Sequence, residues 1–220
     1  NSNTAVGYIS MGSNTTGNNN VAIGRASLVS NTTASNNTAV GYYALTLNTT
    51  GANNVAVGDL SLDANTDGEL NTAVGSSALT TNTTGDNNTA VGRECLRLVQ
   101  TADDNTAVGA QAGAAITTGA GNVAIGKDAG NNTTDGNNNI SIGPQALPAG
   151  GSVSNSICIG KDMGSGENNF SFGKASNVVS NVFTSNASWA RSSDLHKKTN
   201  IESTDLGLSF INELRPVTFN

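Results

Sequence analysis

The 220-residue sequence contains few charged and few aromatic side chains. Charged residues make up 12% of the chain and aromatic residues 4%, with only three prolines, two cysteines and one histidine. The low charge content argues against a charge-expanded disordered chain. The formal net charge of −6 argues against a nucleic-acid partner, because phosphate contacts need clustered Lys and Arg.

The chain also lacks residues that several other classes of site require. His196 is the only histidine, so neither a Ser-His triad nor a Cys/His metal site can be assembled. No apolar run is long enough to span a membrane, and no phosphate-binding or dinucleotide-binding motif is present. We therefore expect no metal, no cofactor, no nucleic acid and no membrane insertion in this segment.

What the sequence has in abundance is one repeated phrase, Asn-Thr-Ala-Val-Gly, which first appears at residues 3–7. Its closing glycine returns at a constant spacing, at positions 7, 24, 41, 58, 75, 92, 109, 126, 143 and 160. A further copy ends at Gly173, after a shorter step from Gly160. So strict a period is typical of a stacked architecture in which each repeat contacts only its neighbours.

Each repeat contains the signals of a strand, a corner and a turn. The residues before the glycine end in Ala-Val or Ala-Ile, which predicts a short strand with one small and one branched position. The glycine itself favours a positive φ or a close backbone approach at a corner. A second short strand is expected around Ala44-Leu45 and its equivalents. The turn at 48–51, Asn-Thr-Thr-Gly, is expected to use left-handed Asn and positive-φ Gly, with Asn side chains stacked in ladders.

These features predict an all-β, parallel β-solenoid with 17-residue coils over residues 1–173. Because the interior positions are mostly small, each coil buries little apolar surface, and association of several chains is a natural further source of burial. Cys95 and Cys158 replace small residues of the repeat, so we interpret them as buried small hydrophobic residues. Residues 63–68 match the start of a calcium loop, but Val74 stands where its bidentate Glu would be, so no calcium site is predicted.

The tandem repeats resemble the heads of trimeric autotransporter adhesins of the YadA type. The resemblance covers residues 3–173 and implies a left-handed parallel β-roll formed by a homotrimer. The 17-residue period departs from the roughly 14-residue unit of those heads. We place the extra residues in the Asn-Thr-Thr-Gly turn.

After Gly173 the composition changes twice. Residues 174–192 are rich in Ser and Asn and predict a connector or neck, with Trp189 as packing. Residues 193–220 then begin with the pattern S-D-x-x-x-K-x-x-I and end with L-x-P-V-x-F, separated by an amphipathic helix stripe at Leu206, Phe210 and Leu214.

This last segment resembles the start of the endosialidase-type intramolecular chaperone domain of phage tail spikes and fibres. The resemblance implies that the domain assists trimerisation and then releases itself by a single self-cleavage before Asp194. Ser193 would be the nucleophile and Lys198 the group that accepts its proton, which is reasonable chemistry for a Ser beside a basic amine. The segment is expected to be truncated at residue 220, and Asn1 to be a cut edge of a longer protein.

Together the two resemblances imply a structural, receptor-binding, trimeric fibre segment rather than an enzyme. Its expected place is a virion appendage such as a tail fibre, outside the cell, and its expected partner a host-surface glycan or surface protein. A bacterial surface adhesin is the alternative, because the repeats alone fit both. A third alternative is the non-catalytic part of a tail-spike depolymerase.

Overall fold

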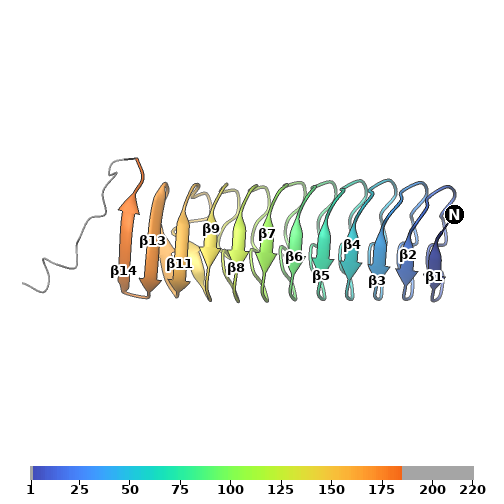
Figure 1. Cartoon of the computed structure of the whole chain (residues 1–220), viewed down its shortest axis with the longest axis horizontal. Coiled ribbons are helices and arrows are strands. Elements are labelled where there is room, and N and C mark those ends of the chain that lie inside the picture. The colour runs from blue at the N-terminus through green and yellow to red at the C-terminus, as the bar shows by residue number, and fades with distance from the viewer. Residues whose placement is uncertain (1, 185–220) are drawn as a thin grey trace, which may run out of the picture. The chain divides into compact units, whose positions relative to one another are not determined.

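The structure is a computed structural model that describes residues 2–184. In this range the chain forms strands and turns but no helix, and therefore no helix that could cross a membrane. Successive coils stack side by side to form a parallel β-solenoid (Figure 1). The predicted all-β class and the 17-residue coil are confirmed, whereas the predicted C-terminal helix and residues 193–220 lie outside the described range.

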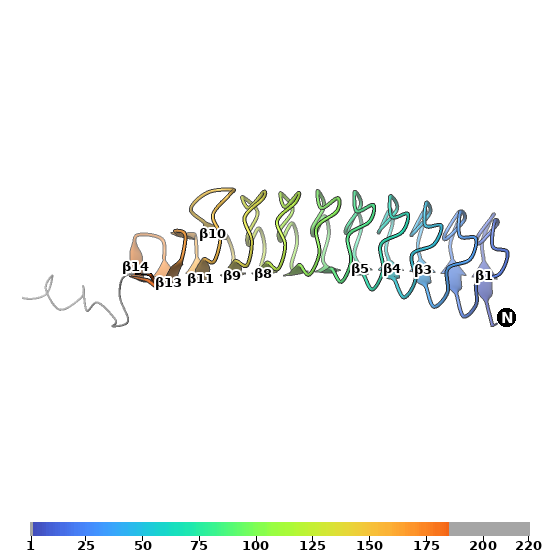
Figure 2. The same cartoon turned by 90° about the horizontal axis from the view of Figure 1, so that it is seen from above.

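Twelve strands form one continuous sheet, in the order β1 to β9, β11, β13, β14. Its strands are β1 Thr4–Val6, β2 Val21–Ile23, β3 Thr38–Val40, β4 Val55–Val57, β5 Thr72–Val74, β6 Thr89–Val91, β7 Thr106–Val108, β8 Val123–Ile125, β9 Ile140–Ile142, β11 Ile157–Lys161, β13 Asn169–Lys174 and β14 Asn177–Val182. The remaining two, β10 Ala146–Pro148 and β12 Met163–Ser165, pair with each other as a second parallel sheet. Figure 2 shows the large sheet along one side of the coils and the loops on the opposite side.

The 17-residue period of the sequence sets the register of the sheet. Thr38 pairs with Val55 and Val55 with Thr72, so that each strand residue pairs with the residue 17 positions later. The shorter last step keeps the same register, because Gly160 pairs with Gly173. β14 then pairs with β13 in the antiparallel direction, so the sheet continues into residues that the sequence predicted as connector.

The inside of most coils is filled by small apolar side chains and one leucine, but glycine replaces the leucine at Gly113 and Gly130. The strand alanines, such as Ala39, and the leucines of the following segment, such as Leu45, are fully buried. Because side chains alternate between the two faces of a strand, the branched residue after each alanine points out of the coil. Cys95 and Cys158 are fully buried and free, which confirms their interpretation as small interior residues.

Two ladders of asparagine run through the interior and bond the coils together. In the first, the backbone N–H of Asn37 donates to Oδ1 of Asn20 at 2.8 Å, and its own Nδ2 donates to the carbonyl of Gly51 at 2.9 Å. In the second, Nδ2 of Asn48 donates to Oδ1 of Asn31 and to the carbonyl of Gly51. These side chains thus satisfy buried backbone groups, as buried polar groups require. The predicted ladder of turn asparagines is confirmed, whereas the first ladder was not predicted.

The corner glycines are required by both conformation and space. Gly41 has a φ of +145°, and a Cβ placed on it would lie 2.2 Å from the carbonyl oxygen of Gly58. The turn glycines differ, because Gly51 has no positive φ but a Cβ there would lie 2.3 Å from the carbonyl oxygen of Gly68. The positive φ of the turn falls instead on a later asparagine, Asn53, at +61°. The prediction was thus right about the corner but wrong about which turn residues are left-handed.

The predicted second strand around Ala44-Leu45 and its equivalents is wrong for the regular coils. Leu45, Leu62 and Leu79 lie in turns with φ values of 53°, 49° and 51°, which is left-handed rather than extended backbone. The backbone N–H of Leu45 still donates to the next coil, at Ser61. The inward leucine ladder exists as predicted, but it is carried by a left-handed turn.

Candidate functional site

The outer face of the large sheet carries an apolar ladder, which we call the outward ladder. It consists of the residue just before each corner glycine, from Val6 to Ile159, and continues at Phe172. Val91, Val108 and Ile125 are 36%, 39% and 40% exposed, whereas the alanine before each of them is buried. Its members are Val6, Ile23, Val40, Val57, Val74, Val91, Val108, Ile125, Ile142, Ile159 and Phe172.

A second row runs parallel to the outward ladder on the same face. It is formed by the residue two positions earlier in each strand, which is Thr, Val, Ile or Phe and is half-buried from β2 onward. Neither row contains a charged residue. A parallel sheet is usually covered on both faces, and a long exposed apolar strip on a soluble protein marks an interaction surface.

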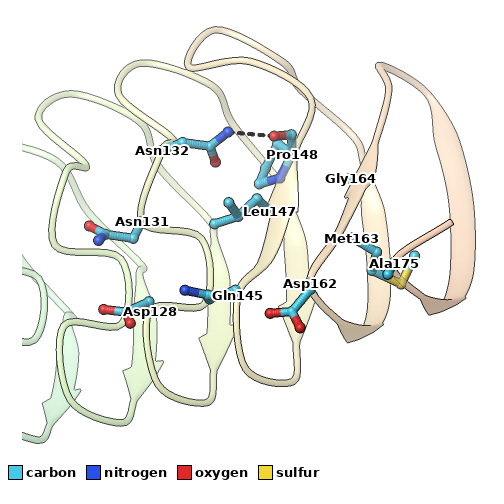
Figure 3. Close-up of a pocket in the computed structure, with 10 residues that line it drawn as sticks. All are labelled: Asp128, Asn131, Asn132, Gln145, Leu147, Pro148, Asp162, Met163, Gly164 and Ala175. Carbon is cyan, nitrogen blue, oxygen red and sulfur yellow. Dashed lines mark hydrogen bonds between the residues drawn. The ribbon is translucent and has the colours of Figure 1, made fainter.

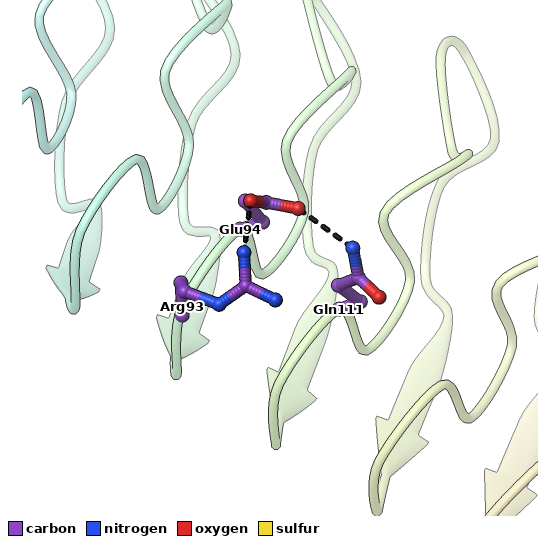
Figure 4. Close-up of polar contacts among 3 residues, drawn as sticks. All are labelled: Arg93, Glu94 and Gln111. Atoms are coloured by element: carbon purple, nitrogen blue, oxygen red, sulfur yellow. Dashed lines mark hydrogen bonds and ion pairs between the residues drawn. The ribbon is translucent and has the colours of Figure 1, made fainter.

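Charged side chains lie just beyond the corner glycines, beside the outward ladder. Arg93 forms an ion pair with Glu94, whose other carboxylate oxygen accepts a 2.7 Å hydrogen bond from Nε2 of Gln111 on the next coil (Figure 4). Lys127 and Asp128 form an equivalent pair at 3.8 Å, two coils after the first. The apolar face is therefore bordered by polar side chains, of which those of Arg93 and Lys127 are 58% and 75% exposed, as at a typical interface rim.

An aromatic patch lies on the same border near the start of the described chain. The guanidinium of Arg25 lies 5.9 Å from the ring centre of Tyr8 and 5.8 Å from that of Tyr42. Tyr42 also contacts Tyr43 edge to face. Cation–π contacts of this length stabilise exposed side chains modestly, so the patch holds the first three coils together at their corner.

Weaker sequence signals are explained by contacts within the solenoid. Asp63 accepts a hydrogen bond from Thr80 at 2.6 Å, and burial raises the pKa of its carboxyl. Asp67 accepts hydrogen bonds from Thr50, Thr49 and Thr66, which lower its pKa. Within residues 2–184, no group of three or more His, Cys, Asp or Glu side chains could hold a metal ion.

The cysteines are placed where they cannot act as nucleophiles in the folded chain. Burial raises the pKa of the Cys95 thiol to about 12, and burial also raises the pKa of Cys158. The Sγ of Cys158 lies 3.4 Å from the carbonyl oxygen of Met163. Because the thiolate is the reactive form, both residues serve the packing of the coil.

No family model, curated protein or solved structure matches this chain. The assignment of a function therefore depends on the residues and their geometry.

The predicted self-cleavage site cannot be placed in the fold, because Ser193, Asp194 and Lys198 lie outside the described residues. The outward ladder was visible in the sequence as a row of branched residues, but not as a surface. Ala39 and Val40 are both apolar, and the structure shows that Ala39 is fully buried in the coil whereas Val40 remains partly exposed.

Proposed function

We propose that this chain is a segment of a homotrimeric, left-handed β-roll fibre that presents a receptor-binding surface. The observation that carries the proposal is the uncharged outward ladder, which follows the sheet from β1 to β13. An apolar strip of this length on a single chain needs a cover. Identical strips on identical chains can cover one another about a common axis, which gives a closed symmetric assembly.

The energy available from the outward ladder is sufficient for association. Full burial of a Val or Ile contributes about 1.5–3 kcal/mol, so a side chain that is still about 40% exposed has roughly 1 kcal/mol to gain. Seven members of the ladder are at least 36% exposed, which gives on the order of 7 kcal/mol per chain, a value within the ~4–15 kcal/mol cost of association. The second row of half-buried residues adds to this.

The C-terminal pattern favours a phage tail fibre or similar virion appendage over a bacterial adhesin. In the chaperone family that it resembles, three β-rich chains assemble before release of the domain, and Ser193, Lys198 and Asp194 match that family's cleavage motif. An adhesin of the autotransporter kind would instead continue into a stalk and a membrane anchor. The third reading, a tail-spike depolymerase, would place its catalytic part elsewhere in the protein.

Expression of the native gene tests the fibre assignment. Mass spectrometry should find a product that ends at Ser193, and Ser193→Ala should abolish that product while Ser192→Ala leaves it. If the wild-type protein stays uncut, the proposed self-cleavage is refuted. The reason to prefer a fibre over an adhesin is then lost as well. A cut in both wild type and Ser193→Ala would assign the cleavage to an external protease.

A further inference from the structure

The solenoid loses its regularity between residues 143 and 173, and an open groove of about 800 Å³ lies there (Figure 3). The coil shortens after Gly160, because the next corner glycine already follows at Gly173. The turns that pack on the next coil elsewhere are replaced by the small sheet of β10 and β12. The groove follows from this change of coil length, because the outer part of the last long coils is no longer covered by an equal neighbour.

One wall of the groove is a row of hydrogen-bonding side chains. Asp128, Gln145 and Asp162 occupy the same position in successive coils, two residues after the corner glycine, with left-handed φ values of 56°, 54° and 52°. Asp128 and Asp162 are paired with the lysines that precede them, at 3.8 Å and 3.6 Å. The carboxylates therefore keep free oxygen positions for a ligand, since each pair uses one contact.

The other wall is mainly apolar and is held in place from within. It includes Leu147 and Pro148 of β10 and Met163 and Gly164 of β12. Nδ2 of Asn132 donates a 2.6 Å hydrogen bond to the carbonyl of Pro148, which ties this wall to the coil before it. Met163 is 5% exposed and packs on the core, so this wall is part of the fold rather than a loose loop.

We propose that this groove binds a neutral pyranose oligosaccharide. Side-chain amides and carboxylates can accept and donate the hydrogen bonds of vicinal sugar hydroxyls, and the apolar wall can pack against the C–H face of a sugar ring. The volume falls within the ~300–1,000 Å³ of typical small-molecule sites. Two carboxylates in the groove disfavour sialylated and other acidic sugars through like-charge repulsion.

The groove shares only Asp128 with the polar rim of the proposed assembly surface. None of the residues that line it belongs to the outward ladder or to the row beside it. The proposal rests on the attachment role proposed above, because it names the receptor class that such a fibre would contact. Trimer formation and sugar binding are nevertheless measured independently, so that one can fail without the other.

Two glycines offer a matched pair of variants. A Cβ on Gly164 would have only the carbonyl oxygen of Leu147 within 4 Å, at 3.8 Å, and one on Gly166 only Nδ2 of Asn169, at 3.7 Å. Neither residue has a left-handed φ. Leucine at position 164 should therefore fill the groove, whereas leucine at position 166 should leave it open, and both variants should fold.

The experiment applies the full protein to an array of neutral hexose oligosaccharides and their sialylated forms, followed by calorimetric titration with the best neutral binder. We expect neutral sugars to bind, Gly164→Leu to lower the affinity at least about tenfold, and Gly166→Leu to match the wild type. The double variant Asp128→Asn, Asp162→Asn should lower the ratio of the affinity for the neutral sugar to the affinity for its sialylated form about tenfold, because the repulsive charges are removed.

Three results would overturn the groove proposal: no neutral oligosaccharide bound, unchanged binding by Gly164→Leu, or a preference of the wild type for sialylated sugars. Light scattering on the same sample measures the mass of the particle in solution and so the number of chains in it. A trimer that binds no sugar refutes the groove alone. A single chain that binds sugar refutes the trimeric fibre and leaves the groove intact.

Discussion

Substitution of Asn71 by alanine should remove a buried link between two coils. Oδ1 of Asn71 accepts the backbone N–H of Asn88 at 2.9 Å, and Nδ2 donates to the carbonyl of Gly85 at 2.7 Å. Gly85 keeps a second donor, Nδ2 of Asn82 at 3.0 Å, but the N–H of Asn88 is left unpaired in the interior. A buried unpaired donor costs about 1–3 kcal/mol, and the lost bond to Gly85 about 1 kcal/mol more.

The free energy of unfolding should therefore fall by on the order of 3 kcal/mol. It is obtained from the urea midpoint and the slope m at fixed protein concentration. The control is Thr84→Ala, because Thr84 lies exposed on a turn and surface substitutions usually stay within about 0.5 kcal/mol. Asn71→Asp separates the two bonds. It keeps an acceptor for Asn88 but sets a buried carboxylate against the carbonyl of Gly85, so it should be unstable at neutral pH.

The pH dependence of Asn71→Asp follows from this geometry. The buried Asp has a folded-state pKa raised above its unfolded value, because burial and the facing carbonyl disfavour the charge. Its destabilisation should thus be largest above the folded pKa and should shrink as the pH falls and the protonated acid donates to Gly85. A free energy of unfolding of Asn71→Ala within about 0.5 kcal/mol of the wild-type value would contradict a stabilising role of the asparagine ladder.

The same structure supports three further predictions. Gly75→Ala should unfold at clearly lower urea concentration than Ser76→Ala, because its φ is +137° and the new Cβ would lie 2.5 Å from the carbonyl oxygen of Gly92; equal midpoints would contradict the close approach. Val91→Asp should keep the β-type circular dichroism spectrum but yield single chains in sedimentation, whereas Val91→Ile should assemble normally; a trimeric Val91→Asp would exclude the outward ladder as the interface. Cys95 and Cys158 should react with a thiol reagent only after unfolding, since both are buried; rapid labelling of the native protein would contradict their burial.

Much of the fold could be predicted from the sequence, because the copies of the repeat can be aligned with one another. The constant spacing of glycines such as Gly41 and Gly58 defines the register of neighbouring strands, and no long-range pairing has to be guessed. Asn48 likewise predicted the ladder of turn asparagines, because identical polar groups in stacked coils meet one another, whereas the ladder of Asn37 was not predicted.

The errors came from residues whose local preference and actual backbone differ. Leu45 looks like a strand residue, yet its φ of 53° places it in a turn, where its burial and the bond from its N–H to Ser61 compensate for the unfavourable conformation. The groove beside Asp162 could not be predicted, because it arises from the meeting of a long and a short coil. Its polar residues belong to different repeats, and no single motif contains them.

The second asparagine ladder ends at Asn82 with an unsatisfied hydrogen-bond acceptor, and the sequence shows why. Val99 occupies the position of Asn82 in the next coil, and it cannot donate to the Asn82 side chain. Oδ1 of Asn82 is accordingly buried without a hydrogen-bond partner. Such a group disfavours folding by an amount comparable to a lost hydrogen bond, so the regular stack tolerates an occasional break.

The mass of the protein in solution tests the central claim most directly. One chain of the given sequence has a mass of 22.1 kDa. Light scattering on the protein expressed from its native gene should give three times the mass of the mature chain, independent of concentration across the working range. A stable single chain with its outward ladder open to water would contradict the account.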